Sequence, residues 1–113
     1  MAIEPDYAPV SSDVIIKGTL RKARTWNKRF FVLREGPPPR LEYYENEKKW
    51  KSNKPKRCID LGSPWNICER KGAKHDFLIV IFTEDEYFTM AAESAEVQQQ
   101  WVDALQKTAK PGE

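Results

Sequence analysis

The sequence has few of the residues from which catalytic and metal sites are built. Its 113 residues include one histidine, His75, and two cysteines, Cys58 and Cys68. The cysteines lack CxxC spacing and are too few for a disulfide framework, so we expect both to be reduced thiols buried in strands. No residues stand in a nucleophile-and-base pattern, and no glycine-rich phosphate loop is present. These absences predict a protein without enzymatic activity, bound metal or cofactor.

Long apolar runs are also missing. None reaches the roughly 18 residues of a membrane-spanning helix, and residues 1–12 lack the basic, apolar and small-residue order of a secretory signal. We therefore expect a soluble, cytoplasmic and monomeric protein. The length suits one domain, expected over residues 14–108. Residues 1–13, which mix prolines with polar side chains, are expected to be a flexible leader, and residues 109–113 the start of a linker to a following domain.

The net charge of +2 conceals a strong separation of charge along the chain. Residues 14–34 carry seven basic and no acidic side chains, and residues 48–57 carry six basic and none acidic. Residues 76–106 reverse the sign, with seven acidic and no basic side chains. A domain of this kind presents a positive pole to an anionic partner. The alternative is that the lysines only solvate loops.

Residues 14–22 and 27–34 show the apolar alternation of two β-strands joined by a short loop. Because side chains alternate across a strand, one face of each strand carries a row of core residues that ends in a cation near the loop. The short connection should bring Lys22 and Arg29 together, which predicts an anion-binding socket. The alternative for Arg29 is a rim arginine paired with Glu42 or Glu45. The two inward rows are Ile16, Gly18, Leu20 and Lys22, and Asn27, Arg29, Phe31 and Leu33.

Five more strands and one helix are predicted after this hairpin. Residues 46–55 are predicted to form a charged loop, in which Trp50 either packs on the sheet, as we expect, or inserts at a membrane interface. From Ser94 onward the apolar residues lie on one helical face, and Trp101 is expected to plug one end of the sheet. The fold class is therefore α+β and mainly β: a seven-stranded antiparallel barrel or sandwich capped by one C-terminal amphipathic helix. The further strands are expected at residues 40–45, 56–61, 65–68, 77–82 and 86–91.

Four short motifs occur in a characteristic order along the chain. They are Gly18-x-Leu20-x-Lys22, the sequence Lys-Arg-Phe-Phe-Val-Leu at 28–33, Leu-x-Tyr-Tyr at 41–44, and the helix tryptophan Trp101. This set resembles a pleckstrin-homology (PH) domain over residues 14–107. More narrowly, the sequence resembles the PH domain of insulin receptor substrate adaptor proteins at residues 40–50, 55–57, 85–88 and 91–94.

The resemblance implies binding of inositol phospholipid headgroups at the open end of the barrel. In the family, residues at the positions of Lys22 and Arg29 grip phosphates, and those at Tyr43 and Arg57 often add contacts, although core packing is the alternative for Tyr43. The family pattern has a basic residue where this chain has Asn27. Arg24 and Lys28 are expected to add further positive charge to the binding region. An electrostatic rim that adheres to an anionic membrane is expected from Lys48, Lys49, Lys51 and Lys54.

Two functions follow as expectations. The first is a non-catalytic module that brings an insulin receptor substrate adaptor to the inner face of the plasma membrane, near an insulin-type receptor tyrosine kinase. The alternative is a protein-interaction module whose basic face binds acidic segments of partner proteins. Nucleic acid is not an expected partner, because the strand aromatics alternate into the core and do not form an exposed stacking platform.

Overall fold

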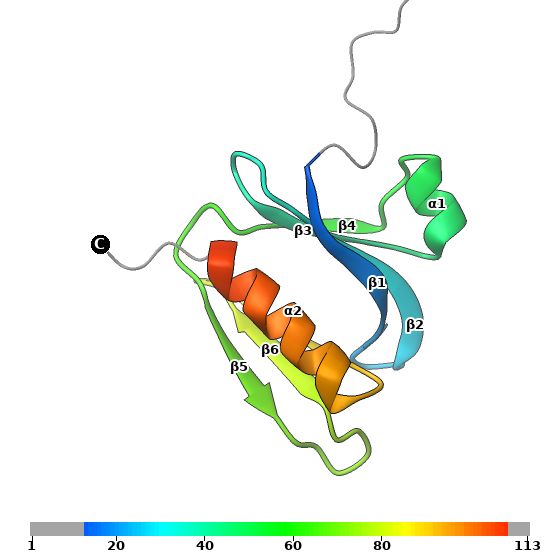
Figure 1. The fold of residues 1–113 in the computed structure, drawn as a ribbon, viewed down its shortest axis with the longest axis vertical. Helices are drawn as coiled ribbons and strands as arrows, with labels where there is room; N and C mark the ends of the chain where they lie inside the picture. Colours follow the sequence, from blue (N-terminus) through cyan, green and yellow to red (C-terminus); the bar gives the residue numbers. More distant parts are fainter. Residues whose placement is uncertain (1–12, 109–113) are drawn as a thin grey trace, which may run out of the picture.

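The computed structural model describes residues 13–108 as seven strands and two helices. The predicted linker at 109–113 lies outside the described residues, as does the predicted leader except for Asp13. The strands form one antiparallel sheet in the order β4-β3-β2-β1-β7-β6-β5, and α2 lies against it (Figure 1). The elements are β1 (Val14–Lys22), β2 (Asn27–Arg34), β3 (Arg40–Tyr44), α1 (Glu47–Lys51), β4 (Arg57–Asp60), β5 (Asn66–Arg70), β6 (Leu78–Phe82), β7 (Tyr87–Ala91) and α2 (Ala95–Thr108). The predicted fold class is confirmed.

The sheet has two halves that meet at one corner. β1 pairs with β2 along nearly its whole length, but it pairs with β7 only through Arg21 and Lys22. The halves β1–β4 and β5–β7 therefore diverge from this corner, and α2 packs between them (Figure 1). Trp101 of α2 is 2% exposed and lies edge-on to Phe31, with ring centroids 6.4 Å apart. The expectation that Trp101 plugs the sheet is confirmed.

The inward rows predicted for the first hairpin carry the main core. Leu20, Phe31 and Leu33 are at most 2% exposed and pack in one cluster with residues of β3, β6 and α2. The outward neighbours on β1, such as Lys17 and Thr19, are exposed. The period of two in the sequence therefore assigned the faces of β1 correctly.

The segment predicted as a charged loop contains a short helix, so that part of the prediction is wrong. Asn46 begins α1 by accepting a hydrogen bond at Oδ1 from the Lys49 N–H, at 2.9 Å. Trp50 turns back onto the outer face of the sheet, where it is 5% exposed and 5.3 Å from the Phe30 ring centroid. Packing of Trp50 on the sheet is thus confirmed, and its packing holds a helix too short to be stable alone.

The expectation that both cysteines are buried is wrong. Cys58 is exposed and Cys68 is half-buried. They lie on β4 and β5, the two edge strands of the sheet. Side chains alternate along a strand, so Cys58 lies on the face opposite the buried Ile59, and Cys68 lies on the face opposite Ile67, which packs against the core.

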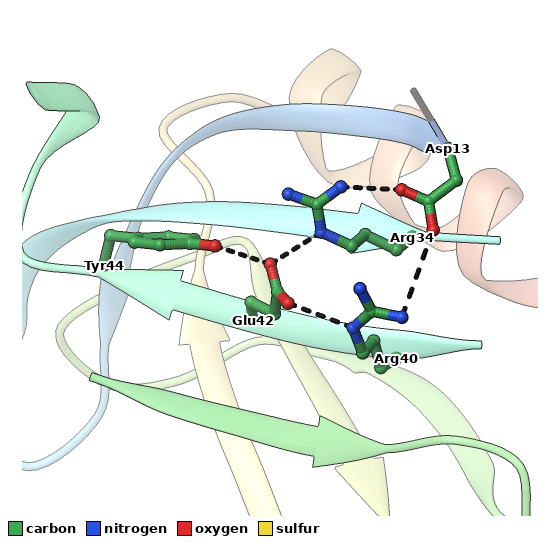
Figure 2. Close-up of polar contacts among 5 residues, drawn as sticks. All are labelled: Asp13, Arg34, Arg40, Glu42 and Tyr44. Atoms are coloured by element: carbon green, nitrogen blue, oxygen red, sulfur yellow. Dashed lines mark hydrogen bonds and ion pairs between the residues drawn. The ribbon is translucent and has the colours of Figure 1, made fainter. Parts of the chain in front are cut away.

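A polar network occupies the outer face of β2 and β3, which sequence alternation alone would assign to solvent (Figure 2). Glu42 accepts hydrogen bonds from Arg34 Nε at 2.8 Å, Tyr44 OH at 2.7 Å and Arg40 Nε at 3.0 Å. Asp13 accepts another from Arg34 Nη1 at 2.6 Å. Arg34 is only 5% exposed and Glu42 only 7%. Both charges are buried and paired, and neither is free to bind a ligand.

The network should make the protein less stable in alkali. Burial, and then the hydrogen bond and charge of Glu42, raise the pKa of Tyr44 to about 12. The stability due to neutral Tyr44 is therefore complete below about pH 10 and is lost as the pH rises towards 12. Urea unfolding should show wild type more stable than Tyr44→Phe at pH 8, with the difference shrinking by about 1 kcal/mol at pH 11. The exposed Tyr87→Phe is the control, and a difference for Tyr44→Phe that stays constant with pH would contradict the assignment.

Candidate functional site

Three connections lie together at one end of the sheet. The pairing of Lys22 with Asn27 closes the β1–β2 hairpin there, and the pairing of Phe30 with Tyr44 places the end of β3 beside the start of β2. The Ala23 N–H donates to the Thr89 carbonyl at 2.9 Å, which ties the hairpin to β7. The β1–β2, β3–β4 and β6–β7 connections therefore surround the same opening, at the end where the sequence places most of its cations.

The tip of the first hairpin is a tight turn. Trp26 N–H donates to the Lys22 carbonyl at 2.8 Å, and Arg24 and Trp26 have positive φ values of 90° and 60°. Trp26 also packs on His75 of the β5–β6 connection, with ring centroids 4.4 Å apart. The turn is therefore anchored on both sides, and it directs the chain so that Arg24 stays near Lys22.

Four cations converge inside this opening, and we call them, together with Tyr43, the socket: Lys22, Arg24, Arg29, Arg57 and Tyr43. Lys22 Nζ lies 5.5 Å from the centroid of the Tyr43 ring, and Tyr43 pairs with Arg57 across β3 and β4. Burial, and then the charges of Arg24, Arg57 and Arg29, lower the pKa of Lys22. The part of this lowering that comes from the arginines reflects like charges near the Lys22 ammonium, and an anion bound among them would relieve the repulsion.

The structure separates Lys28 from the socket. Side chains alternate along β2, so Lys28 points to the face opposite Arg29, where it pairs with Arg21 of β1. With Arg21 and Lys74 it lines a different hollow of about 240 Å³, whose lining also includes the acidic residues Asp76 and Glu93.

The predicted rim lies on and just after α1. Lys48, Lys49 and Lys51 are exposed on this helix, and Lys54 is exposed after it. Because α1 follows the end of β3, these lysines lie at the same end of the sheet as the socket (Figure 1). Their arrangement is that of exposed charges beside a binding site and not within it.

The alternative pairing of Arg29 is not observed. Arg29 Nη1 donates to the Lys28 carbonyl at 3.0 Å, while Glu42 is taken up by the network on the opposite face. Within residues 13–108, no ion pair joins Arg29 to Glu42 or Glu45. Tyr43 has both of the roles considered for it, because its half-buried ring packs on Phe31 at 5.3 Å and faces Lys22.

Sequence reasoning missed the surroundings of Arg57. Its guanidinium lies 4.6 Å from the centroid of the Phe88 ring, and its Nη2 donates to Glu86 Oε2 at 2.5 Å. Both partners come from the β6–β7 side of the opening, 29 and 31 residues along the chain. The shared parity of Glu86 and Phe88 was visible in the sequence, but nothing in the sequence showed that β4 faces them.

Other classes of site find no support in the part of the chain that the structure describes. No group of three or more potential metal ligands occurs within residues 13–108. Neither helix in this range is long and apolar enough to cross a membrane.

Comparisons with known proteins agree with the fold. A family model described as PH domain matches residues 10–110. The chain is 50% identical over 111 residues to insulin receptor substrate 1 of Mus musculus, covering 93% of this chain and 9% of that protein. It is 48% identical over 106 residues to insulin receptor substrate 2 of Homo sapiens, covering 78% and 8%. The chain thus spans about a tenth of the length of these relatives.

Solved structures give the same fold. The crystal structure of the carboxyl-terminal PH domain of pleckstrin has a TM-score of 0.71 at 25% identity, covering 86% of this chain and 97% of that one. The same pleckstrin domain in complex with D-myo-Ins(1,2,3,5,6)P5 has a TM-score of 0.70 at 25% identity, covering 86% and 96%. The chain belongs to the PH domain family, whose members are non-catalytic binding modules, and it is similar over most of its length to the PH domains of insulin receptor substrates 1 and 2.

Proposed function

We propose that this domain binds the phosphorylated headgroup of phosphoinositides in the socket and thereby recruits an insulin receptor substrate adaptor to the inner face of the plasma membrane. The observation that carries the proposal is the placement of Lys22 over the Tyr43 ring, beside Arg57 and with Arg24 and Arg29 near it. Burial, and then the charges of these three arginines, lower the pKa of Lys22. An arginine offers phosphate a planar fork of donors, and a lysine offers a point charge. The similar pleckstrin domain with its inositol pentakisphosphate supports this choice of ligand.

The socket and the rim have different tasks in this proposal. The socket contacts the phosphates directly, so it provides selectivity. The exposed lysines Lys48, Lys49, Lys51 and Lys54 contribute about 1 kcal/mol each near an anionic leaflet, and salt screens this contribution. Binding should therefore have one part that depends on the headgroup and another that depends on salt. In the full-length adaptor, this attachment would bring the rest of the chain near an insulin-type receptor tyrosine kinase.

The test compares Arg29→Ala with Lys28→Ala. The two variants remove one positive charge each from adjacent positions of β2, but only Arg29 belongs to the socket. Calorimetric titration with D-myo-Ins(1,2,3,5,6)P5 should show a loss of roughly 10- to 100-fold for Arg29→Ala, because a charge-assisted hydrogen bond is lost. Lys28→Ala should stay within about twofold of wild type on this soluble ligand. Equal losses in the two variants would reject the socket.

Vesicles extend the test to the membrane. Co-sedimentation with and without a phosphorylated phosphoinositide, at two salt concentrations, should show binding that needs the phosphoinositide and partly survives the higher salt. Binding that follows total anionic charge and disappears with salt would favour the second candidate, in which the basic face binds acidic segments of partner proteins. The observation that favours this candidate is the exposed lysines of α1, because a lysine ammonium binds a carboxylate as readily as a phosphate.

A further inference from the structure

One ion pair crosses the opening of the socket. Arg57 at the start of β4 is hydrogen bonded to Glu86, the residue before β7, at 2.5 Å. β4 and β7 are not neighbours in the sheet, so the contact spans from one half of the fold to the other. The two side chains also line a hollow of about 260 Å³ that contains no other socket residue and whose lining includes the acidic residues Asp60, Glu84 and Asp85. The Arg57 and Glu86 side chains are 42% and 47% exposed. A ligand entering from solvent can therefore reach both.

The turn at 83–86 fixes the position of Glu86. Thr83 N–H donates to the Glu86 carbonyl at 2.8 Å, and Glu86 N–H donates back to Thr83 Oγ1 at 3.3 Å. On the other side, the Arg57 guanidinium lies over the Phe88 ring. The carboxylate is thus held beside a guanidinium that is itself held in place, so the pair is a built feature of the opening.

Arg57 is also one of the cations that act on Lys22, the central charge of the socket. Arg57 Nη2 donates to the Glu86 carboxylate. A phosphate in the socket would also be negatively charged and could accept from the same Arg57 donor. We propose, on the basis of the function proposed above, that Glu86 is an internal competitor for Arg57 and sets the charge a ligand needs. A phosphate monoester carries about two negative charges near neutral pH, so it displaces a carboxylate more readily than a singly charged group does.

Removing the competitor should strengthen binding. Glu86→Gln keeps the shape of the side chain and removes its charge, and it should bind D-myo-Ins(1,2,3,5,6)P5 about two- to fivefold more tightly, the size expected for an exposed ion pair. Glu84→Gln removes the same charge from the same exposed turn and should produce less than half of this gain. In an Arg57→Ala background, Glu86→Gln should give no more than the small gain of Glu84→Gln, because the contested donor is absent.

The outcomes separate this inference from the function on which it rests. Weaker binding by Glu86→Gln would mean that Glu86 positions Arg57 for the ligand. Equal gains from Glu86→Gln and Glu84→Gln would mean a long-range charge effect. Either result would overturn the proposal that Glu86 competes with the ligand for Arg57. If Arg29→Ala weakens binding but Glu86→Gln leaves it unchanged, only the competitor fails. If wild type, Arg29→Ala and Glu86→Gln all fail to bind, the proposed function fails as well.

Discussion

Glu42→Ala is expected to lower the free energy of unfolding by about 3–5 kcal/mol, the usual cost of removing one partner from a buried ion pair. The variant would leave Arg34, which is 5% exposed, without its partner on β3, and Tyr44 without the acceptor of its hydroxyl. Neither group can turn to water without opening the outer face of the sheet. A typical domain has only about 5–15 kcal/mol of stability, so this loss is large. Urea unfolding followed by tryptophan fluorescence measures it.

The control is Glu45→Ala, which removes an exposed glutamate just after the same strand and should cost less than about 0.5 kcal/mol. If Glu42→Ala does not fold, Glu42→Gln provides the measurement, because an amide oxygen still accepts hydrogen bonds while the charge is gone. An intermediate loss of about 1–3 kcal/mol is expected for it. Equal stability of the Glu42 and Glu45 alanine variants would show that the network contributes nothing.

The same network predicts loss of stability in acid. Burial alone would raise the pKa of Glu42, but hydrogen bonds from Tyr44, Arg34 and Arg40 outweigh it, and the pKa is lowered below its ordinary value of 4.5. A carboxylate with a lowered pKa in the folded state stabilises the protein in full above the unfolded value and loses this effect as the pH falls through the folded one. Wild type should therefore lose stability below about pH 4.5, and Glu42→Gln should lose less over the same range.

Sequence alternation predicted the inner face of this sheet well and its outer face poorly. Along the inward rows of β1 and β2, Ile16, Leu20, Phe31 and Leu33 pack in the core, and Lys22 and Arg29 follow with the same period of two in the socket. On the outer face, Val32 and Tyr44 are also buried, because they pack in a cluster with Trp50 of α1. The cover is a contact between segments far apart in the sequence. The short α1 was missed because its one turn has no apolar repeat, only the cap residue Asn46.

Side-chain alternation also predicted part of the socket. Strand parity and one short loop were enough to bring Lys22 and Arg29 together. The contacts of Arg57 depend on how the two halves of the sheet, which are joined at the β1–β7 corner, come together across the opening. Local patterns predict neighbours along a hairpin, but they do not predict which loops meet at the end of a barrel.

Trp101→Ala is the second large effect, with an expected loss of about 3–5 kcal/mol in the free energy of unfolding. The indole is 2% exposed and packs edge-on against Phe31, so its removal leaves a cavity between α2 and the sheet. Trp101→Phe retains an aromatic ring and should lose less than Trp101→Ala. Gln100→Ala, at an exposed position of the same helix, should stay within about 0.5 kcal/mol of wild type. Similar stabilities for Trp101→Ala and Gln100→Ala would contradict the role of Trp101 as the anchor.

The effect of Trp101 on binding should be much smaller than its effect on stability, although its contacts lead to the socket. Trp101 packs on Phe31, Phe31 packs on Tyr43, and Tyr43 lies under Lys22. Tyr43 is nevertheless held by backbone pairing with Phe31 on one side and Arg57 on the other, and this pairing does not involve the indole. Trp101→Phe, measured well below its unfolding midpoint, should therefore bind D-myo-Ins(1,2,3,5,6)P5 within about twofold of wild type. A large loss of binding without a loss of stability would mean that the socket is positioned by the packing of the core, not by the pairing of its strands.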